Sequence, residues 1–536
     1  MNDTRIPRHL PKACPQRFPL QPLISGCPVA AAQQTLGGLV PLGLLQRALA
    51  DLSRGAIHVS GVWSHTANES GIARINPTAT LVFLGDVLTS GPERALEHMA
   101  HEVGPNTKCV ILDLNLANRV FGMPAGTAVQ AVETLTIQQA HYVLSSPHYP
   151  KGDGTPAGQP HAFRIMDDLL NGLDEGAQGH HNVLTMPGGP GWEKVSKPMS
   201  KGLKGSKMPG WMNHAKAVAD RLVTSLAAKK QIDLFHFFKD ATLKISTNVI
   251  FGQDYTSCDG AEEFQKALEG VFSESEFRFR VPWWERAKAL FTKREATYER
   301  NIRIVRDFIA RRVNECREKP ENDNLISTLL DLMDGPEETR PFQSIPELIS
   351  TLLLILIAAH DTTAAALTYF FNDLSQNEKT MAAIHNEVKK KSDFRKLADY
   401  PTLRISFEES LAKTPPISII VRKKVVDPQG LSREDRAREI ELFGIEIPSG
   451  ADLFIPVRYV NAQTSDPKLQ ISFGAGERRC PGEPVAYMVF SIIAHTLIRS
   501  RISLEPIAHE RQGEMNGITR NPKNYRATVH HGSLIE

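Results

Sequence analysis

A glycine-rich loop around one cysteine near the carboxyl end constrains this chain more than any other feature. Residues 473 to 482 read Phe-Gly-Ala-Gly-Glu-Arg-Arg-Cys-Pro-Gly, which places the cysteine at Cys480. Glycines permit positive φ and a close approach of the backbone to a sulfur atom. The helix expected from Gly482 to Arg499 directs its positive end at that sulfur and favours a thiolate. The loop is therefore suited to hold a thiolate that binds a metal.

Two other side chains of the loop suit a bound cofactor. Phe473 can shield the sulfur from water. Arg478 can form a charge-assisted hydrogen bond with a carboxylate of the cofactor. Together with Cys480 they predict one site for a metal-containing, anionic group.

The remaining cysteines and the charge exclude other classes of protein. The six cysteines are scattered and contain no Cys-x-x-Cys pair, so neither a disulfide framework nor a zinc site is expected. This usage is typical of a reducing, intracellular environment. The net charge of +2 over 536 residues gives no global field that favours nucleic acid.

Apolar periodicity predicts a chain dominated by helices, with small strand regions near its start and its end. Cys109–Leu116 and Ala128–Leu135 alternate as a strand pair does, and Thr136–Leu144 is expected as a helix capped by its threonine. Such an order favours one large α+β unit over several domains. Further helices are expected over His214–Lys229, Ile232–Ile250, Ala261–Ser273, Pro282–Glu318, Asn324–Met333, Ile345–Leu374, Asn377–Lys391 and Gly482–Arg499, and strands over Ile440–Ile447 and Asp452–Pro456.

The loop resembles the haem-binding motif of the cytochrome P450 family, Phe-x-x-Gly-x-Arg-x-Cys-x-Gly. The matching residues are Phe473, Gly476, Arg478, Cys480 and Gly482. The resemblance implies a mainly α (α+β) fold, a single large helical domain with a small β-sheet region. It implies haem b as the cofactor, with Cys480 as the axial thiolate ligand of its iron. It also implies a monooxygenase that uses O2.

The long helix Ile345–Leu374 resembles the central helix of that family. Its residues 358 to 363, Ala-Ala-His-Asp-Thr-Thr, are similar to the oxygen-activation motif, with Ala359 where glycine is usual. Dioxygen must receive protons in a pocket that is otherwise dry. The resemblance implies that Thr362 holds a water molecule or the distal oxygen and that Asp361 relays protons from solvent.

Two further residues are similar to family residues that bind haem propionates. Trp192, in Gly191-Trp192-Glu193-Lys194, resembles the tryptophan whose indole N–H lies beside a propionate. The Pro-Pro segment from 415 leads into a strand that lines the pocket, which makes Arg422 the expected second propionate partner.

The chain departs from the family pattern in one network. The Glu-x-x-Arg pair falls on Glu409 and Ala412, so the arginine is absent. The segment that usually supplies its partner is shortened to the residues between Asp466 and Phe473. We expect Glu409 to be stranded in the core unless it is protonated or finds Lys413 or Arg404 as a partner.

Four lysines recur at spacings of three and four residues, at 194, 197, 201 and 204. If the segment is helical they share one face, although Pro198 and Gly202 count against a regular helix. The resemblance places that face where an electron-donating reductase docks. A solvated face without a partner is the alternative.

Residues 1–90 are expected as an irregular extension and residues 91–536 as the haem domain. Within residues 1–90 we see no uninterrupted run of about 20 apolar residues. The expected location is therefore intracellular, either cytoplasmic or peripheral to the endoplasmic reticulum membrane.

The leading functional prediction is a monooxygenase that takes electrons from a separate NADPH-dependent reductase and oxidises an apolar small molecule. The alternatives are a variant that rearranges peroxides without a reductase, and a degenerate haem-binding protein. The intact Asp361–Thr362 pair argues against the first alternative, and Ala412 favours the second. The expected pocket walls, which point to a lipid, terpenoid or aromatic substrate, are the 147–185 loop, Phe264–Phe291, the region of Ala358 and the strand after Pro416.

Overall fold

The computed structural model divides the chain into Met1–Val62 and Trp63–Glu536, and every described residue lies in the second unit. The described residues are 72–74, 98–99, 109–113, 127–131, 135–151, 170, 182–186, 188–204, 207–280, 292–319, 324–336, 340–390, 397–425, 431–444, 446–447, 449–507, 512–516 and 519–532.

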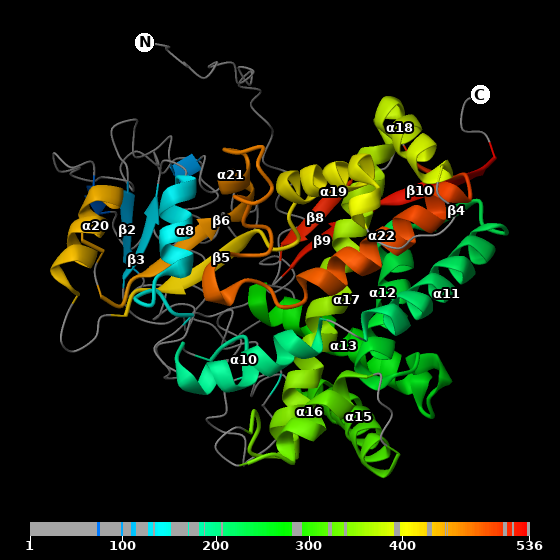
Figure 1. Cartoon of the computed structure of the whole chain (residues 1–536), viewed down its shortest axis with the longest axis horizontal. Coiled ribbons are helices and arrows are strands. Elements are labelled where there is room, and N and C mark those ends of the chain that lie inside the picture. Colours follow the sequence, from blue (N-terminus) through cyan, green and yellow to red (C-terminus); the bar gives the residue numbers. More distant parts are fainter. Residues whose placement is uncertain are drawn as a thin grey trace, which may run out of the picture. The chain divides into compact units, whose positions relative to one another are not determined.

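A five-stranded sheet joins strands from the two ends of this unit (Figure 1). Its β2 and β3 pair antiparallel, as the sequence predicts, and β3 continues parallel to β6. The edge strand β5 pairs antiparallel to β6, with Arg422 opposite Leu453. The strand order is β1 (Ile72–Arg74), β2 (Cys109–Asp113), β3 (Thr127–Ala131), β6 (Asp452–Pro456) and β5 (Ile419–Lys423).

The sheet is covered by α8 (Ile137–Ser145), whose start has the predicted cap. The Thr136 hydroxyl accepts a hydrogen bond from the Gln139 backbone amide, and the Gln139 side-chain oxygen accepts one from the Thr136 backbone amide. This reciprocal capping box fixes the point at which the helix begins. Ala140, Val143 and Leu144 of α8 are buried in a core shared with the sheet.

The larger core surrounds α17 (Ile345–Ser375), which Figure 1 shows running through the middle of the helices. Ser344 caps its start, accepting from the Glu347 amide. Within the core Phe370 packs edge-on against Phe490 of α22 (Glu483–Arg499), with ring centres 4.7 Å apart. The helices around it include α11 (Met208–Leu226), α12 (Leu234–Phe251), α13 (Ala261–Arg280), α15 (Thr292–Glu318), α16 (Leu325–Met333), α18 (Glu378–Lys389) and α19 (Pro401–Lys413).

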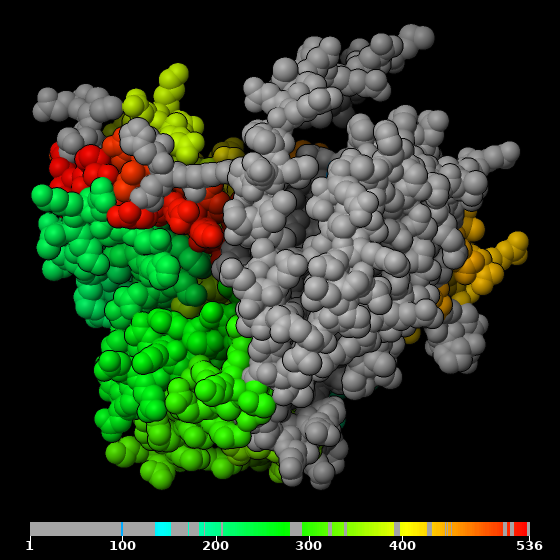
Figure 2. All heavy atoms as spheres, turned by 180° about the vertical axis from the view of Figure 1, so that it is seen from behind, coloured from blue at the N-terminus to red at the C-terminus, as the bar shows by residue number. Residues whose placement is uncertain are grey.

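Two small sheets complete the unit. Strand β10 (Arg526–His531) lies between β4 (Gln231–Asp233) and β7 (Ile502–Pro506). Figure 2 shows these carboxyl-terminal strands in red beside the green helices. The hairpin of β8 (Gly513–Asn516) and β9 (Arg520–Lys523) lies against α17 and α12.

The helices predicted from the sequence are largely confirmed, with shifts at their ends. The helix predicted over His214–Lys229 spans Met208–Leu226, and the one predicted over Ala261–Ser273 extends to Arg280. Ile232 belongs to β4 rather than to a helix. The described part of the predicted helix Pro282–Glu318 begins at Thr292, while residues 281–291 lie outside the described residues. The predicted strand Ile440–Ile447 is wrong, because α20 (Arg433–Phe443) runs through it and ends at Gly444 in the left-handed conformation.

Among the described residues, α17 is the one helix long and apolar enough to cross a membrane by length and composition. Most of it is buried inside the folded unit. The core helix of a globular domain has the same composition as a membrane span when it is apolar on all sides.

Candidate functional site

The loop before α22 is closed by its own backbone. The Cys480 amide donates to the Phe473 carbonyl at 2.8 Å. Gly474 and Gly476 have φ of +73° and +66°, a conformation that favours glycine. A Cβ on Gly476 would lie 2.6 Å from the Leu144 carbonyl oxygen, so no larger residue fits against α8.

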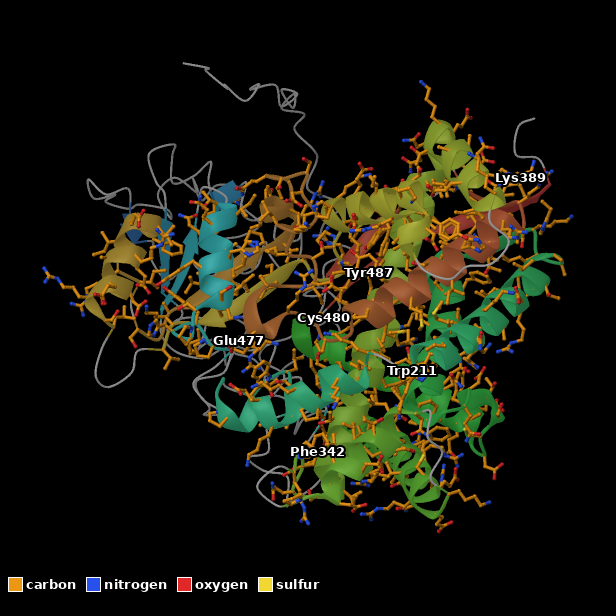
Figure 3. All side chains as sticks on the ribbon, viewed as in Figure 1. Trp211, Phe342, Lys389, Glu477, Cys480 and Tyr487 are labelled. Atoms are coloured by element: carbon orange, nitrogen blue, oxygen red, sulfur yellow. The ribbon has the colours of Figure 1, made fainter. Side chains whose placement is uncertain are left out.

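The sulfur of Cys480 lies at the start of α22 (Figure 3). Cys480 is exposed by surface area, yet the protein around its sulfur is dense enough that desolvation raises the pKa of the thiol. Hydrogen bonds from the backbone amides of Gly482 and Glu483 act in the opposite direction and stabilise the thiolate. Gly482 does not have the positive φ expected of it. Its φ is −81°, and its role is proximity, since a Cβ there would lie 3.7 Å from the sulfur.

Phe473 lies beside the second turn of α22. Its ring centre is 5.5 Å from that of Tyr487, at 34° between planes. Phe473 is partly buried. This pair of rings covers one side of the loop that carries Cys480.

Three cationic side chains lie close together, with Lys151 near Cys480 and with Arg422 and Arg478 near Lys151. Burial and the neighbouring Arg478 lower the pKa of Arg422 to about 10. Burial likewise lowers the pKa of Arg478 to about 10. Burial, Arg422 and Arg478 hold the pKa of Lys151 well below its usual value, against the effect of Cys480. Neither the Arg422 nor the Arg478 guanidinium has an ion pair with a described residue, although Glu477 partly opposes the lowering of the Arg478 pKa.

Trp192 lies in the first turn of α10 (Pro190–Gly202) and supports Arg478. The indole N–H donates to the Val183 carbonyl at 3.2 Å, and the Arg478 guanidinium lies 4.0 Å above the ring. The guanidinium also donates to the carbonyls of Val183 and Met186, at 3.4 and 2.7 Å. Arg478 is thus fixed by a ring and two carbonyls.

Lys151 and Arg422 are brought together because residues 148 to 150 run beside β5. The Lys423 amide donates to the Pro150 carbonyl, and the Val425 amide donates to the His148 carbonyl, each at 2.9 Å. These bonds continue the sheet by one more segment.

A buried ion pair also holds this segment in place. Lys424, which follows β5, and Glu439 of α20 are both fully buried and in contact. The Tyr149 hydroxyl donates to Glu439 at 2.6 Å, and the Ile447 amide donates to the other carboxylate oxygen at 3.1 Å. Burial, followed by the hydrogen bond to Glu439, raises the pKa of Tyr149. This network joins α20 to the segment that ends at Lys151.

On α17, Thr362 and Asp361 face different surroundings. The Thr362 hydroxyl donates to the Ala358 carbonyl one turn earlier, at 2.7 Å. Asp361 is buried, with the Lys239 ammonium 3.0 Å from Oδ1 and the Thr519 hydroxyl donating to Oδ2 at 2.7 Å. Burial opposes ionisation of Asp361, but the Lys239 ammonium and the hydrogen bond from Thr519 outweigh it and lower the pKa of the carboxyl group.

The expected stranding of Glu409 is wrong. Glu409 is exposed on α19, whereas the preceding Glu408 is buried. Arg404 donates to Glu408 at 2.9 Å, and Lys413 pairs with Asp373 at 2.7 Å. The helix therefore turns a different glutamate inward and supplies its cation from one turn earlier.

The shortened connection before the loop is tied to α19 by uncharged groups. The Ser472 hydroxyl donates to the Leu411 carbonyl at 3.2 Å. The Asn461 amide nitrogen donates to Ser472 at 2.9 Å, and Asn461 Oδ1 accepts from the Ile471 amide at 2.8 Å. Asn461 is fully buried at the end of α21 (Val457–Asn461).

The four lysines lie on or just beyond α10, which is helical through Pro198. All four are exposed, at positions 194, 197, 201 and 204. Lys197 pairs with Glu193 of the same helix.

Sequence reasoning missed Lys151, Lys239 and Thr519. Lys151 stands in a Gly- and Pro-rich loop without a motif, and Lys239 stands on an ordinary amphipathic helix. Only the fold brings them to Cys480 and Asp361. Of the expected pocket walls, Trp283, Trp284 and most of the 147–185 loop lie outside the described residues.

The donor set fits a planar group that carries two carboxylates and a thiolate-bound metal. The Arg422 guanidinium is buried and the Arg478 guanidinium is half-buried, so a bound anion would offset the cost of holding both cations there. Backbone amides directed at a sulfur favour the thiolate form. Together with the helical fold, the site defines a haem-thiolate class of protein.

Comparison with known proteins agrees with this class. The family model described as Cytochrome P450 matches residues 136–432, which is more than half of the chain. A crystal structure of a cytochrome P450DA heme domain superposes with a TM-score of 0.65 at 15% identity, covering 84% of this chain and 95% of that one. The chain belongs to the cytochrome P450 family. It is an oxidoreductase of the monooxygenase type that uses a haem cofactor.

Several relatives are 20% to 26% identical to this chain over the residues that align. Geraniol 8-hydroxylase of Swertia mussotii is 20% identical over 62% of this chain and 72% of the relative. Strychnine-11-hydroxylase of Strychnos nux-vomica is 21% identical over 76% of this chain and 80% of the relative. A self-sufficient cytochrome P450 monooxygenase of Penicillium expansum is 26% identical over 52% of this chain and 28% of the relative.

Proposed function

We propose that the protein is an external monooxygenase, which takes electrons from a separate NADPH-dependent reductase and inserts one oxygen atom of O2 into an apolar organic substrate. The observation that supports this most is the meeting of Cys480 with the cations of Arg422, Arg478 and Lys151. These groups lie far apart in sequence, and the fold brings them together.

The proposed cofactor is haem b, whose iron Cys480 would bind through its thiolate. Arg478, Arg422 and Lys151 would pair with its propionates, and Trp192 holds Arg478 in place. The bound haem supplies the oxidising chemistry. Phe473, Gly476 and Gly482 shape the thiolate loop.

The chain's own contribution to the reaction is proton handling and exclusion of water on α17. Asp361 is proposed to hold and pass protons toward the Thr362 hydroxyl. The buried surroundings of Asp361 limit exchange with bulk solvent to the side chains that contact it.

For the electron donor, the face formed by Lys194, Lys197, Lys201 and Lys204 is the proposed docking surface. Exposed charges are screened within about 10 Å at 0.1 M ionic strength. Charge reversal at Lys194 and Lys201, which avoids the Lys197–Glu193 pair, should slow electron transfer from the reductase to the protein, and most strongly at low salt. Reversal of Lys379 and Lys390 on and just beyond α18 is the matched control. Equal salt profiles for the two double variants would contradict the docking assignment.

The proposed substrate is apolar, of the lipid, terpenoid or aromatic class. The names of two relatives, geraniol 8-hydroxylase and strychnine-11-hydroxylase, are compatible with organic substrates of this kind.

The proposed haem domain spans residues 91–536 and follows an extension at residues 1–90. The proposed location is the cytoplasm or the surface of the endoplasmic reticulum membrane. β1, at Ile72–Arg74, lies before that boundary and pairs with β2.

The deciding experiment is an absorption spectrum of the full chain, reduced and exposed to carbon monoxide, followed by turnover with a reductase. A strongly red-shifted Soret band and NADPH-dependent oxygenation support the proposal. Retained haem without turnover supports the degenerate alternative, which Ala412 favours. Product formation from a hydroperoxide alone supports the rearranging variant.

A further inference from the structure

A chain of polar side chains joins α17 to the β8–β9 hairpin and to α13. Asp361 contacts Thr519, Thr519 contacts Asn521, and the Asn521 amide nitrogen donates to Glu276. Asp361 and Asn521 are buried, whereas Thr519 and Glu276 are partly buried. The contacts thus run from α17 toward the surface.

The orientation of the Asn521 amide is set by Glu276. A carboxylate accepts hydrogen bonds, so the amide nitrogen must face Glu276 and the amide oxygen must face away. That oxygen, Oδ1, lies 3.0 Å from the Thr519 hydroxyl. Asn521 is therefore held as an acceptor for Thr519.

The Thr519 hydroxyl consequently has two acceptors and one proton. Asp361 Oδ2 lies 2.7 Å away and Asn521 Oδ1 lies 3.0 Å away. When Asp361 is ionised, Thr519 donates to it. When Asp361 carries a proton on Oδ2, it can donate to Thr519, whose own proton then turns to Asn521.

We propose that Thr519 is a positioning residue that satisfies Asp361 in both of its protonation states, by rotating one hydroxyl proton between Asp361 and Asn521. The arrangement lets Asp361 gain and lose a proton without movement of a heavy atom. The inference deepens the proposed function, because it assigns a proton-handling partner to the acid on α17.

The other charged groups that face Asp361 do not provide this. Lys239 of α12 lies 3.0 Å from Oδ1 and stabilises the ionised form alone. His360, the neighbour on α17, has its pKa lowered to about 3 by burial and by Lys239, so it is neutral at ordinary pH. Glu276 of α13 acts through Asn521.

Two substitutions should shift the pKa of Asp361 in opposite directions. Thr519→Val removes the bond to the carboxylate and raises the pKa of Asp361, whereas Asn521→Leu removes the acceptor that the protonated form needs and lowers it. A charge-assisted hydrogen bond corresponds to a shift of about one pH unit. Thr519→Ser keeps the hydroxyl and should restore wild-type behaviour. Thr368→Val, which removes a buried hydroxyl bonded to Ala364 on the same helix, is the matched control.

The readout is the slope of unfolding stability against pH, measured on the haem-loaded full chain between about pH 5 and pH 3. A group with a depressed folded pKa adds stability above its unfolded pKa, and this stability is lost as pH falls through the folded pKa. Thr519→Val should therefore flatten the slope and Asn521→Leu should steepen it. A merely structural role lowers the whole curve without changing its slope, as expected for Thr368→Val.

A second readout is turnover, in which Thr519→Val should release more hydrogen peroxide per electron and show a larger solvent isotope effect, with rescue by Thr519→Ser. Slopes for Thr519→Val and Asn521→Leu that match Thr368→Val would overturn the proposal. Because the slope needs no turnover, its outcome is separate from that of the proposed function, which fails if wild-type protein lacks the thiolate carbonyl spectrum.

Discussion

The Arg478 guanidinium lies 4.0 Å above the Trp192 ring, and both side chains donate to the Val183 carbonyl. The ring interaction is a cation–π contact in a partly desolvated setting. It fixes a cation whose pKa is already lowered by burial. Trp192 thus acts on the proposed propionate site through Arg478, while its own N–H is bound to the chain.

We predict that Cys480→His abolishes the red-shifted Soret band of the reduced carbonyl complex, because that band requires thiolate donation. Cys316→Ser, at a buried cysteine on α15, should keep the band. The check is an absorption spectrum of both variants at equal haem content. Retention of the band by Cys480→His would assign another ligand.

We predict that Thr362→Ala consumes reductant but releases more peroxide and less product. Its hydroxyl donates to its own helix at Ala358, so the loss should change stability by only about 1 kcal/mol. Product and peroxide per NADPH are the quantities to compare. Thr362→Ser should recover coupling, and unchanged coupling in Thr362→Ala would remove this role.

The fold was more predictable from the sequence than the site. Period and capping located α8 and most of the helices, because both signals are local. The strand predicted at Ile440–Ile447 failed because α20 is capped by Ser432 and Gly444, and caps outweigh a short apolar alternation. Lys151 and Lys239 act only through long-range contacts, which leave no pattern in the sequence.

We predict that His360→Gln makes stability less sensitive to acid. The folded pKa of His360 is about 3, and an unfolded histidine has a pKa of about 6.5. Because the folded pKa is depressed, the unfolded state binds more protons between those values and stability falls as pH falls. As pH falls from about 6 to about 4, the free energy of unfolding of the wild-type protein should decrease by about 1.4 kcal/mol more per pH unit than that of the variant.

Denaturant unfolding at a series of pH values measures this difference. His236→Gln, at an exposed histidine, is the control and should leave the slope as in the wild type. Parallel curves for wild type and His360→Gln would show that His360 is protonated in the folded state.

We predict that Lys424→Met destabilises the protein by about 3–5 kcal/mol, because it strands the buried Glu439. The double variant Lys424→Met/Glu439→Leu should be less destabilised than the single one, since no charge is left buried. Chemical denaturation checks both. A double variant as unstable as the single one would mean that Tyr149 and Ile447, which also contact Glu439, dominate the network.

We predict that Glu408→Gln lowers the free energy of unfolding by about 1 kcal/mol. The loss is small because solvent screens the charge of its partner Arg404, which is half exposed. Glu409→Gln should lie within about 0.5 kcal/mol of the wild type, because Glu409 is exposed. Thermal unfolding of the two neighbours distinguishes them. A larger loss for Glu409→Gln than for Glu408→Gln would reverse the assignment of the inward-facing glutamate.

The five-stranded sheet has a consequence for biosynthesis. During synthesis, β3 cannot pair until β6 has been made. The Tyr149 hydroxyl likewise has no bond to Glu439 until that residue, 290 positions later in the chain, has been made. A ribosome therefore releases most of the helices before the cationic residues beside Cys480 can assemble, so the site is completed late in synthesis. A product truncated before β5 would expose an unpaired strand edge, which is a template for aggregation.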